Sequence, residues 1–424
     1  MGLRVLELYS GIGGMHYAVK ESGVSADVVA AVDINTIANE VYQFNFPDCN
    51  LMQRSIEGIT LKEFMKINAD VLLMSPPCQP FTRVGLQADS NDPRTRSFFH
   101  LLKTLQSLSH PPNFILVENV KGFETSDTRN NLIETLNVCK YGYQEFLLSP
   151  NQFGIPNSRL RYFLLAKRHP YKFNFKLTDQ ILEELPQKQN LTEMSQDCTQ
   201  ETRPSLVRKS AEKSDGNKFS DCAMDGLSQL LEHCSCISDK VTESCDDDGA
   251  SSSSSHLLVA NSNIDHNDQS IRCVREFLEG DVQDITDYLI PDKILFRFGK
   301  VMDIVKPDCR RSCCFTKAYH HYVEGTGSVY QMNTTADTKK AFEKFLKSPS
   351  DDDDERISLL KNLQLRYFTP REVANLMCFP PEFSFPESIS LKQRYRLLGN
   401  SLNVHVVAVL LQKYLLDDCQ QKKS

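Results

Sequence analysis

A cysteine in a proline-rich loop, Cys78, is the residue of this chain best placed to do chemistry. It lies in the stretch Ser75-Pro76-Pro77-Cys78-Gln79-Pro80-Phe81, directly after the apolar run Val71–Met74. A buried strand that ends in a rigid turn presents a reactive group at the carboxyl edge of an open α/β sheet. The prolines limit the shapes that such a loop can adopt. Alone, a cysteine of this kind is more often an ordinary thiol in a turn, so its interpretation depends on the rest of the chain.

A glutamate and two arginines accompany other strand-like runs. Glu118 ends an apolar run, so we expect it at the same sheet edge as Cys78. Its carboxyl group could transfer a proton if burial raises its pKa. Arg159 and Arg161 are two residues apart beside the run Tyr162–Ala166, so they point to one face and could hold a carbonyl oxygen or a phosphate. Taken separately, Glu118 could be a helix cap and the arginines could be surface residues.

A glycine-rich turn and a later acidic residue indicate a nucleoside site. Gly11, Gly13 and Gly14 follow the apolar run Leu3–Leu8, and glycine there lets the backbone approach a ligand closely. Asp33 ends the next strand-like run, about 20 residues further on, where an acidic side chain can bind ribose hydroxyls. The turn lacks the third glycine of a dinucleotide fingerprint, so S-adenosylmethionine suits it better. By itself, such a turn is often merely a tight loop.

Together these residues fit the methylation of cytosine at C5. That carbon is a poor nucleophile, and a thiolate that adds at C6 supplies electrons to the ring. The ring nitrogen N3 must then receive a proton or a strong hydrogen bond, which suits Glu118. Arg159 and Arg161 can hold the O2 atom. The occurrence of all these groups with Cys78, in this order, is hard to explain by separate structural roles.

The chain resembles the cytosine-5 methyltransferases. The matching motifs are Leu8–Gly14, Pro76–Phe81, Glu118-Asn119-Val120, Asn157–Arg161 and Gly399-Asn400-Ser401-Leu402, with Cys314-Phe315-Thr316 as the mark of the type-two branch of the family. The resemblance extends from Leu3 to about Arg168 and from about Phe277 to Tyr414. It implies an α/β fold, namely a Rossmann-like S-adenosylmethionine-dependent methyltransferase sheet with a small target-recognition domain inserted.

The same resemblance implies the ligands. S-adenosyl-L-methionine would be held by Ile12, Gly13, Gly14, Asp33, Ile34, Ile56, Glu57, Ser97 and Asn400. The implied catalytic residues are Cys78, Glu118, Arg159 and Arg161, and the implied substrate is cytosine 38 in the anticodon loop of tRNA-Asp. Two alternatives stay open. DNA could be the substrate, because DNA and RNA enzymes of this kind share their catalytic residues, and the chain could be a non-catalytic nucleic-acid-binding homologue.

The composition is typical of a large soluble enzyme. The chain has 424 residues, 40% of them hydrophobic, which is enough for a main core and a second domain. We see no apolar run of the ~20 residues that span a bilayer and no signal-like N-terminus. The 14 cysteines then indicate reduced thiols. We expect a cytoplasmic monomer, with the nucleus as a further location. The net charge of -7 argues weakly against a nucleic-acid partner, since the distribution of charge matters more than its sum.

Strand-like and helix-like segments alternate in the first part of the chain, which is typical of a parallel sheet. The expected strands are Leu3–Leu8, Val28–Asp33, Val71–Met74, Phe114–Glu118 and Tyr162–Ala166, and the expected helices include Thr36–Phe44, Phe98–Leu108 and Thr128–Cys139. We assign residues 1–170 to the N-terminal part of the catalytic domain. Residues 171–364 form the target-recognition region, with an insert at about 187–267 whose Ser- and Asp-rich composition favours disorder.

Residues 365–424 are expected to complete the catalytic domain. Thr369-Pro370-Arg371-Glu372 and Ser390-Leu391-Lys392-Gln393 both have the pattern of a capping box at a helix start. Leu402–Leu416 then has helical apolar periodicity. A helix that returns after a long insertion suggests that the end of the chain packs back on the N-terminal sheet.

A metal site is not expected. Three cysteines and two histidines are close in the sequence, namely Cys309, Cys313, Cys314, His320 and His321. Their spacing fits none of the usual zinc patterns, which need a second pair of ligands at short spacing. We therefore assign Cys314 to the substrate-facing surface and leave its chemical role open.

Overall fold

The computed structural model describes residues 2–77, 95–187, 268–280, 282, 284–348 and 353–417. Cys78 and the insert from residue 188 to residue 267 lie outside the described residues. None of the helices in the described ranges combines the length and the apolar character needed to cross a membrane.

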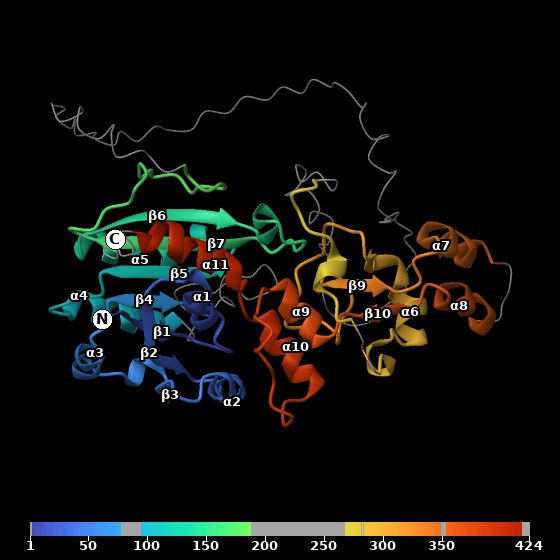
Figure 1. Ribbon diagram of the computed structural model, residues 1–424, viewed down its shortest axis with the longest axis horizontal. Helices are drawn as coiled ribbons and strands as arrows, with labels where there is room; N and C mark the ends of the chain where they lie inside the picture. Colours follow the sequence, from blue (N-terminus) through green and yellow to red (C-terminus); the bar gives the residue numbers. More distant parts are fainter. Residues whose placement is uncertain are drawn as a thin grey trace, which may run out of the picture.

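A seven-stranded sheet dominates the part of the molecule formed by the first half of the chain (Figure 1). Its strand order is β3-β2-β1-β4-β5-β7-β6. The strands are β1 (Leu3–Leu8), β2 (Ala26–Asp33), β3 (Leu51–Gln53), β4 (Val71–Met74), β5 (Phe114–Val120), β6 (Tyr141–Leu148) and β7 (Arg161–Arg168). All five strands predicted from the sequence are present, whereas β3 and β6 were not predicted.

One strand departs from the parallel arrangement that the alternation indicated. The pairs β2–β3, β1–β2, β1–β4 and β4–β5 are parallel, but β7 is antiparallel to both β5 and β6. Parallel neighbours need a long crossover, usually a helix. The connection between β6 and β7 contains the short 3₁₀ turn Pro150–Phe153 instead of an α-helix. As a result, the amino end of β7 lies at the carboxyl end of β5, where Arg161 pairs with Val120.

Helices cover both faces of the large sheet. They are α1 (Gly14–Ser22), α2 (Thr36–Asn45), α3 (Leu61–Ile67), α4 (Arg96–Ser107) and α5 (Asp127–Val138). The fully buried strand β4 contributes to the cores on both faces of the sheet, because successive side chains of a strand point to opposite faces. Val71 and Leu73 belong to the core with α1 and α2, and Leu72 and Met74 to the core with α3, α4 and α5.

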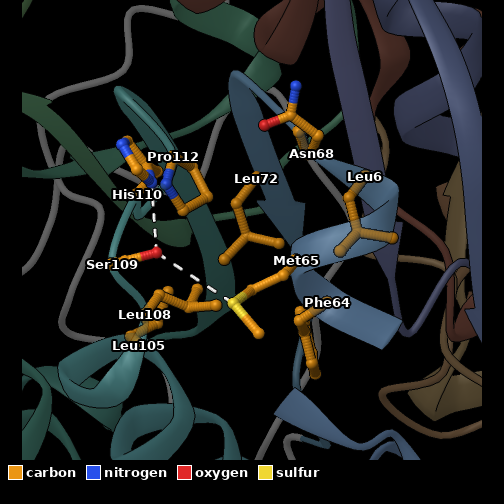
Figure 2. Close-up of a pocket in the computed structure, with 11 residues that line it drawn as sticks. Leu6, Phe64, Met65, Asn68, Leu72, Leu105, Leu108, Ser109, His110 and Pro112 are labelled. Carbon is orange, nitrogen blue, oxygen red and sulfur yellow. Dashed lines mark hydrogen bonds between the residues drawn. The ribbon is translucent and has the colours of Figure 1, made fainter. Parts of the chain in front are cut away.

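A small pocket opens at the amino edge of the large sheet (Figure 2). Its volume is about 180 Å³, and Leu72, Phe64 and Leu105 contribute to its walls. The Ser109 hydroxyl lies 4.0 Å from the Met65 sulfur. The lining contains no carboxylate, guanidinium or thiol group. The groups that the sequence singled out for catalysis must therefore be sought at the opposite edge.

A second, smaller sheet belongs to the middle of the chain (Figure 1). Its order is β10-β9-β8, with β8 parallel and β10 antiparallel to β9. Its strands are β8 (Asp303–Val305), β9 (Ser328–Gln331) and β10 (Leu365–Tyr367), and the helices beside it are α6 (Asp292–Phe298), α7 (Thr338–Lys347) and α8 (Asp353–Lys361).

The last helices connect the two sheets. They are α9 (Pro370–Leu376), α10 (Leu391–Gly399) and α11 (Val404–Leu410), which continues as the π-helical turn Leu411–Leu415. Both predicted capping boxes are confirmed, at Thr369 and at Ser390. In Figure 1, α9 and α10 lie between the large and the small sheet, and α11 lies beside α1. The segment just before α11 also lies close to α1, because a Cβ on Gly14 would be 3.1 Å from the Ser401 hydroxyl.

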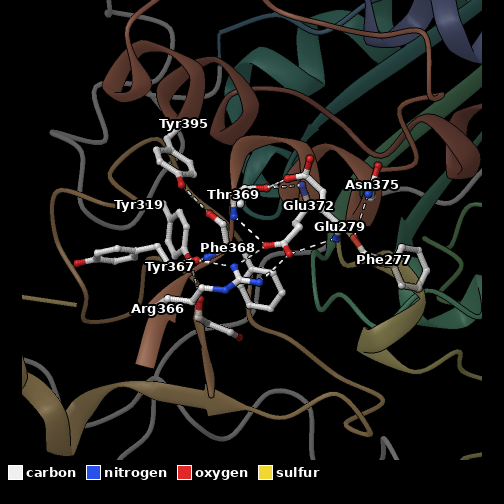
Figure 3. A network of polar contacts seen from close by, with 11 residues as sticks. Phe277, Glu279, Tyr319, Arg366, Tyr367, Phe368, Thr369, Glu372, Asn375 and Tyr395 are labelled. Atoms are coloured by element: carbon white, nitrogen blue, oxygen red, sulfur yellow. Dashed lines mark hydrogen bonds and ion pairs between the residues drawn. The ribbon is translucent and has the colours of Figure 1, made fainter. Parts of the chain in front are cut away.

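A buried ion pair fixes α9 to the small sheet (Figure 3). Arg366 on β10 donates two hydrogen bonds to the Glu372 carboxylate on α9, at 2.7 and 2.8 Å. Their exposed fractions are 4% and 0%. Glu372 also accepts from the Thr369 amide at 2.9 Å, which closes the capping box. Every oxygen of this buried carboxylate therefore has a donor, as a buried charge requires.

We predict that breaking this pair is costly. Arg366→Met should lower the free energy of unfolding by about 3–5 kcal/mol, because it leaves the Glu372 charge buried without its partner. The matched control is Lys361→Met, which removes the cation of the exposed Lys361–Asp292 pair. That variant should lose no more than about 1 kcal/mol. Urea unfolding of both variants measures the difference, and equal losses would contradict this account.

Candidate active site

A second pocket, with several charged groups in its lining, is found at the carboxyl edge of the large sheet. Its volume is about 260 Å³. The segments that follow β1, β2, β4 and β5 line it, together with residues before β7 and after α10. Of the predicted site residues, Ile12, Gly14, Asp33, Ile34, Glu118, Arg159, Arg161 and Asn400 line this pocket. Residues far apart in the sequence therefore meet at the edge where an open α/β sheet binds its ligands.

Asp33 holds the glycine-rich turn in place. One oxygen of its carboxylate accepts a hydrogen bond from the Gly11 amide at 2.8 Å, and the other accepts from the Asn35 amide at 2.8 Å. Gly13 adopts a left-handed conformation, with φ 85°, and a Cβ there would collide with the Phe46 ring. Because a carboxylate oxygen has two acceptor positions, each oxygen of Asp33 can still accept a ligand hydroxyl.

Several pocket groups are poised for a polar ligand. The Oε1 atom of Glu7, the hydroxyl of Ser10 and the Nε of Arg159 are buried without a hydrogen-bond partner among the described residues. Burial raises the pKa of Glu7 to about 8, although Tyr42 donates a hydrogen bond to its other oxygen at 2.9 Å. At the rim, Ile34 exposes 69% of its surface, which gives a flat apolar ligand a contact. These features fit a nucleoside that also carries charged groups.

Four of the predicted cofactor residues do not line the pocket. Gly13 shapes the turn, and Ile56 is buried in the 3₁₀ turn Ile56–Gly58, next to the exposed Glu57. Ser97 reaches the pocket indirectly, because its hydroxyl lies 3.0 Å from the hydroxyl of Tyr9, which is a lining residue. Contact between these residues and a ligand stays a prediction.

The loop that leads to Cys78 is tied to its surroundings at its described end. Pro76 and Pro77 line the pocket. The Asn119 side chain donates to the Pro76 carbonyl at 3.3 Å, and the Ser75 hydroxyl donates to the Tyr9 carbonyl at 3.1 Å. These bonds join the segment after β4 to β5 and to the turn after β1. The bond from Asn119 gives the asparagine after Glu118 a structural role, which the sequence alone did not show.

Glu118 lies next to the arginines, as the sequence suggested. The residue is 8% exposed, and its carboxylate lies 3.5 Å from the Nε of Arg161. Burial raises the pKa of Glu118, and the charges of Arg161 and Arg159 oppose this rise only in part. A carboxyl group with a raised pKa keeps its proton to a higher pH than usual and can deliver it to a bound base.

Arg159 is more deeply buried, with 2% of its surface exposed. It donates to the carbonyl oxygens of Phe315 at 2.9 Å and of Gly399 at 3.2 Å, and also to that of Ser401. Gly399 is required at its position, because a Cβ there would collide with the backbone of Thr316 and Lys317. The pocket is therefore closed by segments from the middle and the end of the chain.

The sequence did not indicate every lining residue. Glu7 faces the pocket from inside β1. Only the alternation of side-chain directions along this strand could have predicted that position. Tyr9 and Ser401 lie inside recognised motifs but were not named as contacts. Within the described residues, no three His, Cys, Asp or Glu side chains are grouped so that they could hold a metal ion.

The comparison with known families shows the family of this chain. A family model described as C-5 cytosine-specific DNA methylase matches residues 3–415. The chain belongs to this family. The matched range includes the strands and helices that build the pocket.

Relatives and solved structures cover nearly the whole chain. A Bos taurus protein named tRNA (cytosine(38)-C(5))-methyltransferase is 50% identical, over 97% of this chain and 98% of its own length. A Dictyostelium discoideum protein named DNA (cytosine-5)-methyltransferase is 38% identical, over 97% and 93%. The crystal structure of a DNMT2 mutant from Spodoptera frugiperda superposes with a TM-score of 0.71 at 39% identity, over 97% and 99%. The family uses S-adenosylmethionine-dependent methyl transfer, which fits the pocket.

We predict that Asp33 contributes to cofactor affinity. Asp33→Ala should weaken S-adenosylmethionine binding by about 1.5–3 kcal/mol, the range for hydrogen bonds to a charged group. The control is Asp27→Ala, which removes an exposed carboxylate from the other end of the same strand. Isothermal titration calorimetry measures both affinities. Unchanged affinity in a folded Asp33 variant would remove this residue from the site.

Proposed function

We propose that the protein is a tRNA cytosine C5-methyltransferase that methylates cytosine 38 in the anticodon loop of tRNA-Asp. The observation that carries the chemistry is the meeting of Glu118 and Arg161, 3.5 Å apart, in a pocket that Pro77 also lines. The tRNA substrate is supported by the names of the more similar relatives, which are 41–50% identical over almost the whole chain.

The residues of the pocket divide into a nucleophile and groups that hold the base. Cys78, outside the described residues, follows Pro77 directly and supplies the thiolate that bonds to C6 of cytosine. The electron pair of the C5–C6 double bond then shifts toward C5 and N3, which lets C5 form the bond to the methyl group. Loss of the proton on C5 afterwards restores the double bond, breaks the S–C6 bond and releases the Cys78 thiolate. Glu118 supplies the proton or hydrogen bond at N3, for which its raised pKa is suited. Arg161, paired with Glu118, is placed to hold O2, while Arg159 supports the adjoining wall.

The groups around the glycine-rich turn are suited to S-adenosyl-L-methionine. When bound, this cofactor supplies an electrophilic methyl group on a positively charged sulfur. Asp33 offers acceptors for the ribose hydroxyls, and Ile34 offers an apolar surface for the adenine. Glu7 and Ser10 offer buried polar atoms without partners among the described residues. The pocket also contains Asn400 from the last part of the chain, so binding would involve both ends of the sequence.

DNA is the second candidate substrate, because the Dictyostelium discoideum relative carries the name of a DNA enzyme. We favour RNA for a further physical reason. The base must leave its stack to enter the pocket, which costs a few kcal/mol in a duplex. Bases of an anticodon loop are already unpaired, so this cost is smaller there. We also propose a monomer, and a location in the cytoplasm with the nucleus as a further one, because a chain with 14 cysteines and no signal-like N-terminus suits a reducing compartment.

We expect methyl transfer to RNA and not to duplex DNA. The protein is incubated with radiolabelled cofactor and with either tRNA-Asp, the same tRNA with cytosine 38 replaced by uridine, or duplex DNA. Label should appear in the first sample and disappear with the replacement. Label in DNA alone would overturn the RNA assignment, and label in none of them would favour a non-catalytic binding protein.

The covalent role of Cys78 gives a separate prediction. Cys78→Ala should reduce turnover to less than a few per cent of wild type and leave cofactor affinity nearly unchanged, because the thiol acts on the base. Substrate RNA with 5-fluorocytosine at position 38 should form a trapped adduct with the wild-type protein and none with the variant. A variant that kept substantial turnover would exclude Cys78 as the nucleophile.

A further inference from the structure

A buried glutamate, Glu7, lines the pocket at the carboxyl edge of the large sheet. Only 1% of its surface is exposed, and its neighbours on β1, namely Val5, Leu6 and Leu8, are apolar and buried. One carboxylate oxygen, Oε2, accepts a hydrogen bond from the Tyr42 hydroxyl at 2.9 Å. The other, Oε1, is buried without a hydrogen-bond partner among the described residues. Buried polar groups normally have a partner, so an unpaired oxygen in a pocket indicates a position for a ligand group.

The side chains packed against Glu7 orient its carboxyl group. Tyr42 on α2, which donates to Oε2, is itself held by His16 on α1, whose Nδ1 lies 2.8 Å from the Tyr42 hydroxyl. The His16 ring is stacked on Phe46, with ring centroids 3.7 Å apart. Burial lowers the pKa of His16 to about 3, so this imidazole is neutral at physiological pH. Tyr42 and His16 therefore fix the carboxyl group without bringing a positive charge to it.

The charge state of Glu7 follows from these surroundings. In the described part of the chain, the ionisable groups that act on Glu7 are Tyr42 and Asp33, and neither of them is a cation. Backbone amides at the start of α1, those of Met15 and His16, favour the carboxylate but do not offset its burial. Burial raises the pKa of Glu7 to about 8, so most of these side chains carry a proton at pH 7.

The cofactor proposed for this pocket supplies the charge that Glu7 lacks. S-adenosyl-L-methionine has a positively charged sulfur and an α-ammonium group. The product of methyl transfer, S-adenosylhomocysteine, keeps only the ammonium group. A positive charge within ~4–6 Å favours the ionised form of a carboxyl group by about tenfold to a thousandfold. Such an effect is large enough to ionise much of Glu7 at neutral pH.

We propose that Glu7 recognises the positive charge of the cofactor and releases a proton to the solvent when the cofactor binds. The inference rests on the proposed function, because it concerns the cofactor assigned to this pocket. The O–H bond of the Glu7 carboxyl group breaks, the proton passes to water, and the carboxylate pairs with the ligand cation through Oε1. Before binding, the proton spares the protein an unpaired charge in a buried position. Tyr42 is a positioning residue, since it holds Oε2.

This role makes the affinity depend on pH and on the charge of the ligand. Glu7 carries more protons in the free protein than in the complex, so the affinity for a cationic ligand should rise with pH. The rise should level off near pH 8, where Glu7 begins to be ionised before the ligand arrives. A ligand without a positive charge should gain no such advantage.

Isothermal titration calorimetry on the full chain tests the proposal. S-adenosyl-L-methionine is titrated at pH 7 in two buffers with different enthalpies of ionisation, which gives the number of protons released per ligand bound. Wild type should release about half a proton to one proton more than Glu7→Gln, which cannot ionise. Glu7→Gln should also bind about tenfold or more weakly. The matched control, Asp27→Asn, changes an exposed carboxylate outside the pocket and should behave as wild type.

Two further ligands identify the cation that Glu7 recognises. Adenosine has neither positive charge, so it should cause no proton release from wild type. S-adenosylhomocysteine should cause the same release as S-adenosyl-L-methionine if the ammonium group faces Glu7, and a smaller one if the sulfur does. Equal release from wild type and Glu7→Gln, or release on binding of adenosine, would overturn the proposal.

Infrared difference spectroscopy follows the Glu7 proton directly. Ligand-free wild type at pH 7 should show the C=O band of a protonated carboxyl group that Glu7→Gln lacks, and S-adenosyl-L-methionine should remove this band. The loss of the band from wild type needs no variant, so it decides the question even where Glu7→Gln does not fold. Cofactor binding that leaves the band in place would refute the inference and not the proposed function. The absence of any binding would refute the proposed cofactor, and the inference with it.

Discussion

The burial of Arg159 is the constraint on which the rest of the site depends. A guanidinium group cannot give up its charge, so the chain around it must supply acceptors for its donors. These acceptors come from Phe315 in the middle of the chain and from Gly399 and Ser401 near its end. One buried side chain of the N-terminal half thus joins three segments, and the pocket exists where they meet.

The antiparallel strand β7 is what makes this arrangement possible. Arg159 and Arg161 precede or begin β7, and in an antiparallel neighbour of β5 that end lies beside Glu118 and Val120. A parallel β7 would carry the arginines to the other edge of the sheet, away from Glu118. The direction of one strand therefore determines whether a carboxyl group and two cations share a site.

Many of the strands and helix starts could be predicted from the sequence, because the patterns that mark them lie within a few neighbouring residues. The apolar runs of β1 and β4 were predicted with their observed bounds, and the capping boxes at Thr369 and Ser390 mark true helix starts.

The strand β6 was missed because it contains the buried polar residues Gln144 and Glu145, which resemble loop residues in the sequence. Their partners, among them the Tyr162 hydroxyl at 2.7 Å from Glu145, are supplied by the fold. The environment of Cys314 could not be predicted for the same reason: the arginines that face it are more than a hundred residues away.

The close contact between Gly14 and Ser401 has a consequence for the order in which the protein can mature. A ribosome releases the chain from its amino end, and early segments begin to fold before later ones exist. The large sheet can form at that stage, but α1 then lacks the helix α11 that lies beside it, and Arg159 lacks two of its carbonyl acceptors. The site is therefore completed only when the end of the chain has been made. A product truncated before Gly399 would contain every residue assigned to catalysis but would lack the segment that closes the pocket around them.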